Sequence, residues 1–115
     1  MQAITPSQLD DWLRQETADG ATVPVLLDVR EPWELQTASV PPGPGYELLA
    51  MPMRSVPARL AELDRDRPIA CLCHHGGRSA QVARFLQDQG YTRVVNVHGG
   101  IDLWSRERDP SIPRY

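Results

Sequence analysis

Residues 71–79, Cys71-Leu72-Cys73-His74-His75-Gly76-Gly77-Arg78-Ser79, lie between a short apolar segment and a segment with helical periodicity. The apolar segment, 68–72, is typical of a buried strand, and 79–89 repeats apolar residues at helical spacing before Gly90 ends the pattern. Cys73 is therefore predicted at a strand-to-helix turn. A buried strand followed directly by a helix is typical of α/β proteins.

The turn itself predicts a reactive thiol. Gly76 and Gly77 tolerate unusual backbone dihedral angles, so successive backbone N–H groups can point at the sulfur of Cys73. The helix that begins near Ser79 adds its positive N-terminal end, and Arg78 adds a permanent charge. These features favour the thiolate, which is the nucleophilic form of cysteine. We predict that Cys73 performs covalent chemistry.

Three motifs resemble those of the rhodanese (sulfurtransferase) superfamily. The segment from Cys73 to Ser79 is similar to the family's active-site loop. Residues 26–31 resemble its N-terminal motif, and residues 94–104, which contain Gly99-Gly100-Ile101, resemble its C-terminal motif. The motifs occur in the family's order and span almost the whole chain. The resemblance implies one three-layer α/β domain over residues 1–115, with a central, mostly parallel sheet of about five strands flanked by helices.

The resemblance also implies an activity. Cys73 would take sulfane sulfur from thiosulfate or a similar donor, hold it as a persulfide, and pass it to a thiophilic acceptor such as cyanide, a thiol or a protein. No cofactor is implied. Two alternatives stay open: a persulfide carrier that relays sulfur between partner proteins, and an interaction module without catalysis. The substrate-binding residues that the family loop implies are His74, His75, Gly76, Gly77, Arg78 and Ser79.

A second polar group follows the strand predicted at 23–29. Ligands of α/β proteins bind beyond the carboxyl ends of the strands. We therefore expect Asp28 and Arg30 near the same edge of the sheet as Cys73, as candidates for the rim of the active site. Arg30 is expected to pair with Asp28 or Glu34.

Arg78 has two candidate roles. Its guanidinium can bind an anionic donor such as thiosulfate in a bidentate manner, or it can tie the loop to a carboxylate such as Asp28. We favour donor binding.

The spacing of Cys73 and Arg78 separates two reaction classes. Four residues lie between them, whereas six lie between Cys71 and Arg78. Cysteine phosphatases and arsenate reductases have a loop one residue longer than the Cys73 loop, which encloses a tetrahedral oxyanion. The shorter loop favours the holding of a single sulfur atom, whose negative charge N–H groups can stabilise.

A metal site is not expected. Cys71, Cys73, His74 and His75 lie within five consecutive residues, and the second ligand pair that typical zinc sites have is missing. His98 is far from them in the sequence. We expect the two adjacent histidines to provide loop backbone and local positive potential.

Cys71 and Cys73 are the only cysteines. We expect their side chains to point to opposite faces of the strand, and therefore not to form a disulfide. The absence of a disulfide framework and of a leader after Met1 favours a reducing compartment, the cytoplasm.

Composition excludes several classes of function. The chain has 115 residues and a net charge of −3, which gives no broad basic surface for nucleic acid. No apolar segment approaches the length of a membrane span, so neither nucleic acid nor membrane is expected as a partner. All twelve basic residues are arginine, which excludes mechanisms that need a lysine nucleophile.

The rest of the chain predicts the elements that flank the sheet. We expect Trp33 and Trp104 in the core. Residues 38–53 depart from the family pattern and are rich in proline and glycine. The remaining predictions are a helix from Thr5 or Ser7 to near Gly20, a short helix at 31–35, a loop at 38–53, a helix at 55–63, a strand at 94–97, a helix at 101–106 and an extended tail at 109–115.

Overall fold

The computed structural model describes residues 2–20 and 22–115, which form an α/β fold around a five-stranded sheet in the order β1-β5-β4-β2-β3. Every strand pair among these residues is parallel, and the predicted parallel sheet is confirmed. The strands are β1 (Gln2–Ile4), β2 (Val25–Asp28), β3 (Glu47–Ala50), β4 (Ile69–Leu72) and β5 (Val94–Val97).

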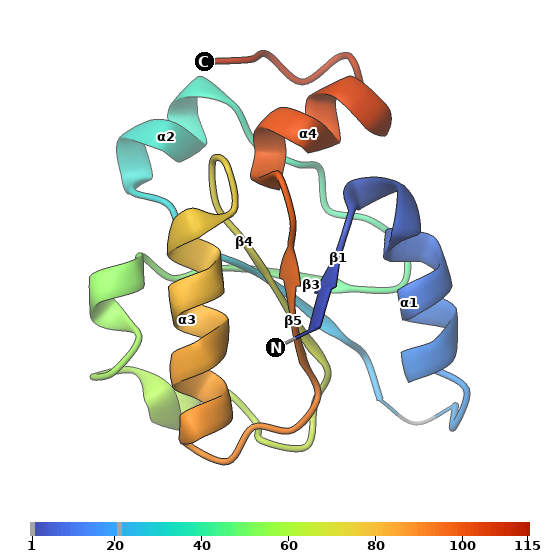
Figure 1. Ribbon diagram of the computed structural model, residues 1–115, viewed down its shortest axis with the longest axis vertical. Coiled ribbons are helices and arrows are strands. Elements are labelled where there is room, and N and C mark those ends of the chain that lie inside the picture. The colour runs from blue at the N-terminus through green and yellow to red at the C-terminus, as the bar shows by residue number, and fades with distance from the viewer. Residues whose placement is uncertain (1, 21) are drawn as a thin grey trace.

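Helices cover both faces of the sheet (Figure 1). Apolar residues of α1 and α4 pack on one face, and residues of α3 and of the segment 53–63 pack on the other. No helix in the described part of the chain is both long enough and apolar enough to cross a membrane. The helices are α1 (Leu9–Glu16), α2 (Pro32–Thr37), α3 (Gly77–Asp88) and α4 (Gly100–Glu107), with shorter 3-10 helices at Pro6–Gln8, Met53–Ser55 and Leu60–Glu62.

The central strands are buried on both faces, which explains why their sequences are continuously apolar. In β4, Ala70 and Leu72 belong to the α1 and α4 side of the core, whereas Ile69 and Cys71 belong to the α3 side. Because all strands run in the same direction, their carboxyl ends meet at one edge. Figure 1 shows that the loop between β4 and α3 rises at this edge, between α2 and α4 and near the C-terminus.

The prediction of a continuous loop at 38–53 was wrong for its second half. Residues 47–50 form β3, an edge strand that pairs with β2 from Val25↔Glu47 to Asp28↔Ala50. The strand has four residues and is only partly buried, and its short apolar run at 48–51 lies between a proline- and glycine-rich segment and Pro52, so it was assigned to the loop. Its pairing with β2 supplies the hydrogen bonds that the local sequence does not suggest.

The predicted helix at 55–63 was also wrong. The segment contains two 3-10 helices joined by turns, with a single helix-like bond from the Arg59 N–H to the Ser55 carbonyl. Pro57 would lie in the first turn, where proline is tolerated, so the departure comes later. The N–H groups of Glu62 and Leu63 bond to the Arg59 and Leu60 carbonyls three residues back, which tightens the second turn into a 3-10 helix. Val56 and Leu63 are nevertheless buried, as the apolar spacing indicated.

Two smaller expectations fail at exposed parts of the fold. β1 was not predicted; it is an edge strand of three residues that pairs with β5. Trp33 was expected in the core but is 62% exposed on α2, whereas Trp104 of α4 is buried as expected.

Candidate active site

Two hydrogen-bond donors lie within reach of the buried sulfur of Cys73. The Gly76 N–H donates to Sγ at 3.1 Å, and the Ser79 hydroxyl lies 3.3 Å from it. Cys73 is only 1% exposed. Gly76 directly precedes α3, so the sulfur lies beside the positive end of that helix. Hydrogen-bond donors and a helix N-terminus stabilise a sulfur anion, the form that attacks electrophilic sulfur.

Gly76 makes this arrangement sterically accessible. Its φ of 103° is a conformation that residues with a Cβ rarely adopt, and a Cβ there would lie 3.0 Å from the backbone nitrogen of Gly99. Gly77, which the sequence also identified as tolerant of unusual dihedral angles, does not use this freedom. It is the first residue of α3, it has no positive φ, and open space surrounds its Cα.

The N-terminus of α4 holds the loop from the other side. The Ile101 N–H donates to the Cys73 carbonyl at 2.8 Å, and the Asp102 N–H donates to the His74 carbonyl at 3.1 Å. This approach requires Gly100, because a Cβ at that position would lie 2.4 Å from both carbonyl oxygens. The predicted C-terminal motif therefore acts as a support for the cysteine loop.

Arg78 forms a bidentate ion pair with Glu34, with both nitrogen–oxygen distances at 2.7 Å. Glu34 is buried and also accepts hydrogen bonds from the Glu31 N–H and the Tyr115 hydroxyl. The bond from Arg78 is the main cause that holds the pKa of Glu34 at about 2. The alternative that Arg78 ties the loop to a carboxylate is confirmed, but the carboxylate is that of Glu34 rather than the suggested Asp28. Binding of a donor by Arg78 stays a prediction, and it would use the guanidinium N–H groups that do not face Glu34.

Asp28 and Arg30 form a second, fully buried ion pair. Arg30 donates to both carboxylate oxygens of Asp28, at 2.9 and 2.8 Å, and its remaining nitrogen reaches the Ala38 carbonyl and the Tyr115 hydroxyl. The pairing of Arg30 with Asp28 is confirmed, as is their position at the same edge as Cys73: Asp28 is in register with Leu72. Both side chains are buried, so they fix the segment after β2 and present no free charge at the rim.

His74 is the middle ring of an aromatic stack. The ring of Tyr115 lies 3.8 Å from it on one side, and the ring of His75 lies 3.9 Å from it on the other. Burial, followed by the charge of His75, lowers the pKa of His74. The stack thus connects the Cys73 loop to the C-terminal residue Tyr115.

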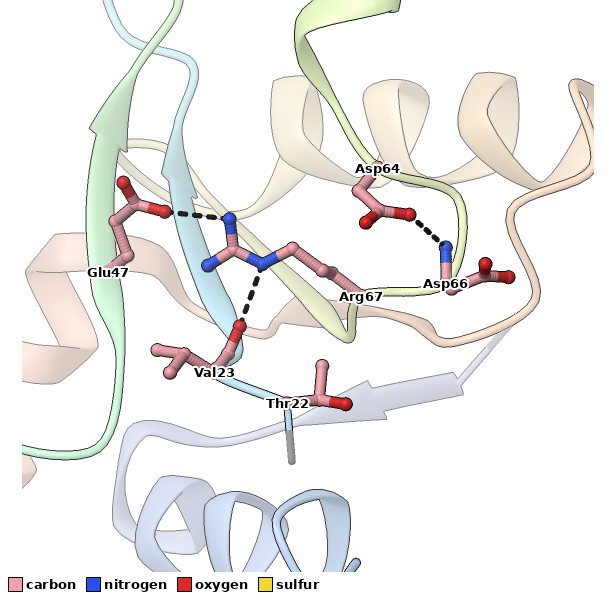
Figure 2. Close-up of a pocket in the computed structure, with 6 residues that line it drawn as sticks. All are labelled: Thr22, Val23, Glu47, Asp64, Asp66 and Arg67. Atoms are coloured by element: carbon pink, nitrogen blue, oxygen red, sulfur yellow. Dashed lines mark hydrogen bonds and ion pairs between the residues drawn. The ribbon is translucent and has the colours of Figure 1, made fainter. Parts of the chain in front are cut away.

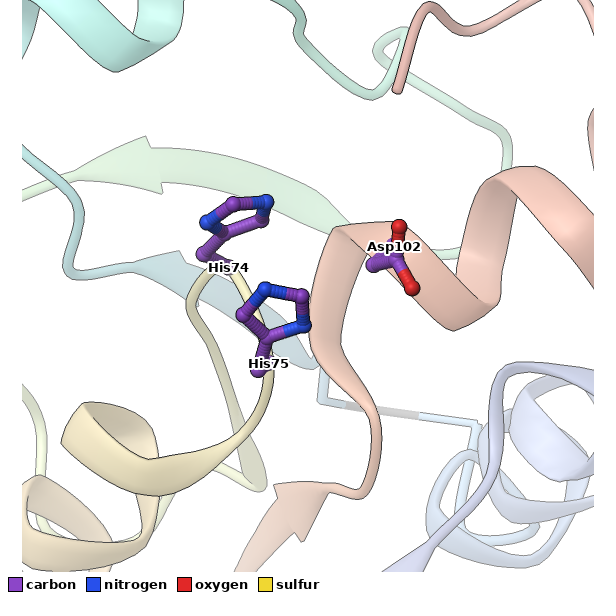
Figure 3. A group of neighbouring side chains, drawn as sticks. All are labelled: His74, His75 and Asp102. Atoms are coloured by element: carbon purple, nitrogen blue, oxygen red, sulfur yellow. The ribbon is translucent and has the colours of Figure 1, made fainter. Parts of the chain in front are cut away.

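His74, His75 and Asp102 offer ligand atoms that all lie within 4.8 Å of one another (Figure 3). Imidazole ligands bind an ion along their own ring planes, and the two stacked rings are only 28° from parallel. Asp102 is engaged by Arg114 at 2.9 Å. These residues would have to give up the stack and the ion pair to coordinate a metal together.

The sequence did not lead us to Asn96 of β5 as a site residue, although its side chain bonds to Gly76 of the loop and to Ser79. Its Nδ2 donates to the Gly76 carbonyl at 3.2 Å, and its Oδ1 accepts from the Ser79 hydroxyl at 2.5 Å. The sequence does contain an indication of this role, because Asn96 is the one polar residue in the otherwise aliphatic strand 94–97. Such a residue is rarely buried without a hydrogen-bonding role.

Cys71 and Cys73 share one face of the strand, contrary to the sequence expectation. Alternate residues of a strand point to the same side, and both cysteines belong to the α3 side of the core. Both are free. Complete burial, followed by the charge of Cys73, raises the pKa of Cys71 well above that of an ordinary thiol.

A pocket of about 520 Å³ lies at the opposite, amino-terminal edge of the sheet (Figure 2). Its floor is crossed by Arg67, which reaches the Glu47 carboxylate at 2.8 Å and the Val23 carbonyl at 2.9 Å. The carboxylate of Asp64 accepts from the Asp66 N–H. None of these side chains belongs to the Cys73 loop.

Comparison with known proteins relates the whole chain to sulfurtransferases. A "Sulfurtransferase" of Allochromatium vinosum is 37% identical over 100 residues, which cover 87% of this chain and 88% of that protein. "Thiosulfate sulfurtransferase GlpE" of Pseudomonas syringae is 32% identical over 80 residues, which cover 70% of this chain and 71% of that protein. "Probable adenylyltransferase/sulfurtransferase MoeZ" of Mycobacterium tuberculosis is 30% identical over 97% of this chain, but the match covers only 26% of MoeZ.

The fold and the family agree with these relatives. The crystal structure of a rhodanese-related protein from Thermoplasma volcanium superposes with a TM-score of 0.74 and 29% identity, and covers all of both chains. The sequence model of the family described as "Rhodanese-like domain" matches residues 9–107, which contain Cys73 and all three motifs. This chain therefore belongs to the rhodanese family.

Proposed function

We propose that the protein is a sulfurtransferase that carries sulfane sulfur on Cys73. In the first step, the Cys73 thiolate attacks the outer sulfur of thiosulfate or a comparable donor. A bond forms between Sγ and that sulfur, the sulfur–sulfur bond of the donor breaks, and sulfite leaves with the electron pair. The enzyme is left as a persulfide.

In the second step, a thiophilic acceptor attacks the outer sulfur of the persulfide. The new bond forms to cyanide, a thiol or a protein nucleophile, and Cys73 leaves as the thiolate. The free enzyme is regenerated and ping-pong kinetics follow. Neither step requires an external oxidant or a resident cofactor, because sulfur is exchanged between nucleophiles.

The observation that supports this proposal is the pair of donors at Sγ. The Gly76 N–H and the Ser79 hydroxyl can stabilise negative charge on the sulfur before attack and after departure. The loop holds these donors rigidly, since α4 bonds its carbonyls from the opposite side. A preorganised set of donors contributes more than mobile water would.

Intact-protein mass spectrometry after incubation with thiosulfate tests the proposal. Wild type is expected to gain the mass of one sulfur atom, and cyanide or a thiol is expected to remove it. Cys73→Ser should gain none, whereas Cys71→Ala, which leaves the loop cysteine in place, should load like wild type. Loading of Cys73→Ser would contradict the assignment of the nucleophile.

Arg78 favours a second candidate, a persulfide carrier that receives sulfur from a protein. Both terminal nitrogens of Arg78 donate to the Glu34 carboxylate, so the charge of Arg78 is already compensated before any small anion binds. The match with MoeZ covers only 26% of MoeZ, so the region that resembles this chain is part of a larger protein there. Weak loading by thiosulfate beside rapid loading by a cysteine desulfurase would favour the carrier. An inert Cys73, which iodoacetamide fails to alkylate near neutral pH, would favour an interaction module instead.

A further inference from the structure

Asn96 lies at a position where a polar side chain is costly. It is 5% exposed, and in the parallel register of the sheet it faces Cys71 of β4. Its side chain therefore projects to the α3 side of the sheet, beneath the loop that holds Cys73. Burial of an amide is offset only if its donor and acceptor atoms are both bonded.

The orientation of the amide is fixed by its neighbours. The Gly76 carbonyl can only accept a hydrogen bond, so the Asn96 atom that faces it at 3.2 Å must be the amide nitrogen. The amide oxygen then faces the Ser79 hydroxyl at 2.5 Å. The Gly76 carbonyl also accepts the Ala80 N–H of α3 at 3.1 Å, so it keeps a partner when Asn96 is replaced.

The Ser79 hydroxyl has one hydrogen and two acceptors. Asn96 Oδ1 lies 2.5 Å from its oxygen, and Cys73 Sγ lies 3.3 Å from it. Ser79 is fully buried, and Cys73 and Asn96 are only 1% and 5% exposed, so both acceptors lie away from bulk water. A hydroxyl donates only one hydrogen bond at a time. The two acceptors compete for that hydrogen.

The outcome of the competition depends on the charge of the sulfur. Beside a neutral thiol, the hydrogen of Ser79 points at Asn96, and the serine oxygen can accept from the thiol. Beside a sulfur anion, the hydroxyl turns its hydrogen to Sγ because bonds to a charged acceptor are stronger. Asn96 Oδ1 and Ser79 Oγ then face each other as two acceptors without a hydrogen between them. The amide of Asn96 thus opposes the formation of the anion.

We propose that Asn96 is a positioning residue that acts through the Ser79 hydroxyl and sets the pH at which Cys73 becomes reactive. The inference rests on the proposed role of Cys73 as the nucleophile. The hydroxyl keeps its own hydrogen throughout and only rotates, while the thiol proton leaves to solvent. The other titratable or charged groups around the loop stay unchanged in the variants below: Cys71 of β4, His74 and His75 of the loop, Arg78 of α3, Glu34 of α2, Asp102 of α4 and Tyr115 of the C-terminal tail.

The test is the rate of alkylation of Cys73 by iodoacetamide as a function of pH, with the modified residue identified by mass spectrometry. Asn96→Leu removes the acceptor at similar side-chain volume. The pH at half-maximal rate is expected to fall, so that alkylation below that pH becomes about three- to tenfold faster, the equivalent of one hydrogen bond. Ser79→Ala removes the donor and is expected to shift the profile in the opposite direction by a similar factor.

The double variant shows whether Asn96 acts through Ser79. When Ser79→Ala is already present, adding Asn96→Leu is expected to leave the pH profile where Ser79→Ala put it. Val95→Ala is the matched control: it lies on the same strand but faces the α1 and α4 side of the core, and it should lower stability without moving the profile. If Asn96→Leu does not fold, as judged by urea unfolding, Asn96→Ala removes the same acceptor and carries the same expectation.

An unchanged or raised half-maximal pH in Asn96→Leu would overturn the inference. An equal shift of the pH profile by Asn96→Leu in the wild-type and Ser79→Ala backgrounds would overturn it as well. These readouts need no sulfur donor. Failure of wild type to load sulfur from thiosulfate or a desulfurase, beside the expected alkylation profiles, would therefore refute the proposed function and leave the roles of Asn96 and Ser79 supported.

Discussion

The two ends of strand β4 carry charged residues in very different settings. Just before the strand, Arg67 spans an open pocket and pairs with Glu47, whose side chain is about half exposed. Just after it, Cys73 lies in a closed loop supported by two ion pairs whose carboxylates, Asp28 and Glu34, are both buried. The amino end thus has a solvated ion pair in an open pocket, and the carboxyl end has buried charges that are fully hydrogen-bonded.

The difference shows what distinguishes the candidate active site from an ordinary surface pocket. An open pocket lined by charges leaves those charges solvated, and their interactions are weak. At the carboxyl end, each buried charge has its hydrogen bonds satisfied, and the loop between them is held so that an N–H and a hydroxyl meet one sulfur. Directed donors in a rigid setting mark the candidate active site, whereas the size of a cavity does not.

The largest difference between the two ends is expected for their ion pairs. Asp28→Asn leaves the buried guanidinium of Arg30 without its counter-charge and should lower the free energy of unfolding by about 3–5 kcal/mol. Glu47→Gln, the matched change at the amino end, should cost less than about 1 kcal/mol because its pair with Arg67 is solvated. Urea unfolding of both variants near neutral pH measures the contrast. Equal losses would show that the two pairs do not differ in the way their burial indicates.

The next largest effect is expected at Gly100, where α4 meets the cysteine loop. Gly100→Ala should lower the free energy of unfolding by about 3 kcal/mol, since its Cβ would collide with two carbonyl oxygens and its φ of 61° would become strained. Sulfur loading of the remaining folded protein should also fall, because the loop must move. Gly77→Ala is the control in the same loop: open space surrounds it, so stability and loading should be nearly unchanged. A well-tolerated Gly100→Ala would mean that the loop does not depend on close contact with α4.

The sequence predicted the central strands well because their burial on both faces produces a local signal. The predicted strand at 94–97 matches β5 residue for residue, and 68–72 differs from β4 by one position. The edge strands β1 and β3 escaped detection because pairing with a neighbouring strand, rather than their own composition, stabilises them. The 3-10 segments near Pro57 were predicted as one helix because apolar spacing alone does not distinguish 3-10 turns from an α-helix.

The same distinction applies to the candidate site. Cys73 and its loop were found because the cysteine, the glycines and the following helix are contiguous. The partner of Arg78 was missed because Glu34 lies 44 positions away, and Tyr115, which also bonds Glu34, lies 81 positions from it. No spacing rule selects one carboxylate among fifteen acidic residues across such distances, whereas the three-dimensional fold does.

The smallest of the expected effects concerns Glu34 and depends on pH. The pKa of Glu34 is about 2 in the folded protein, below the ordinary value of 4.5, chiefly because Arg78 donates two hydrogen bonds to its carboxylate. A lowered pKa means that Glu34 stabilises the fold fully at pH values above 4.5. This stabilisation is lost as the pH falls from 4.5 towards 2, where the carboxylate becomes protonated in both states.

Glu34→Gln should therefore be less stable than wild type by about 1–3 kcal/mol near neutral pH, because charged hydrogen bonds are replaced by weaker ones. The difference should shrink steadily below the ordinary pKa of the carboxyl, as wild type loses the same charge. Urea unfolding at a series of pH values measures it, with Glu47→Gln as the solvated counterpart. A difference that stays constant down to about pH 3 would show that the shape of the Glu34 side chain, rather than its charge, secures Arg78 and the loop.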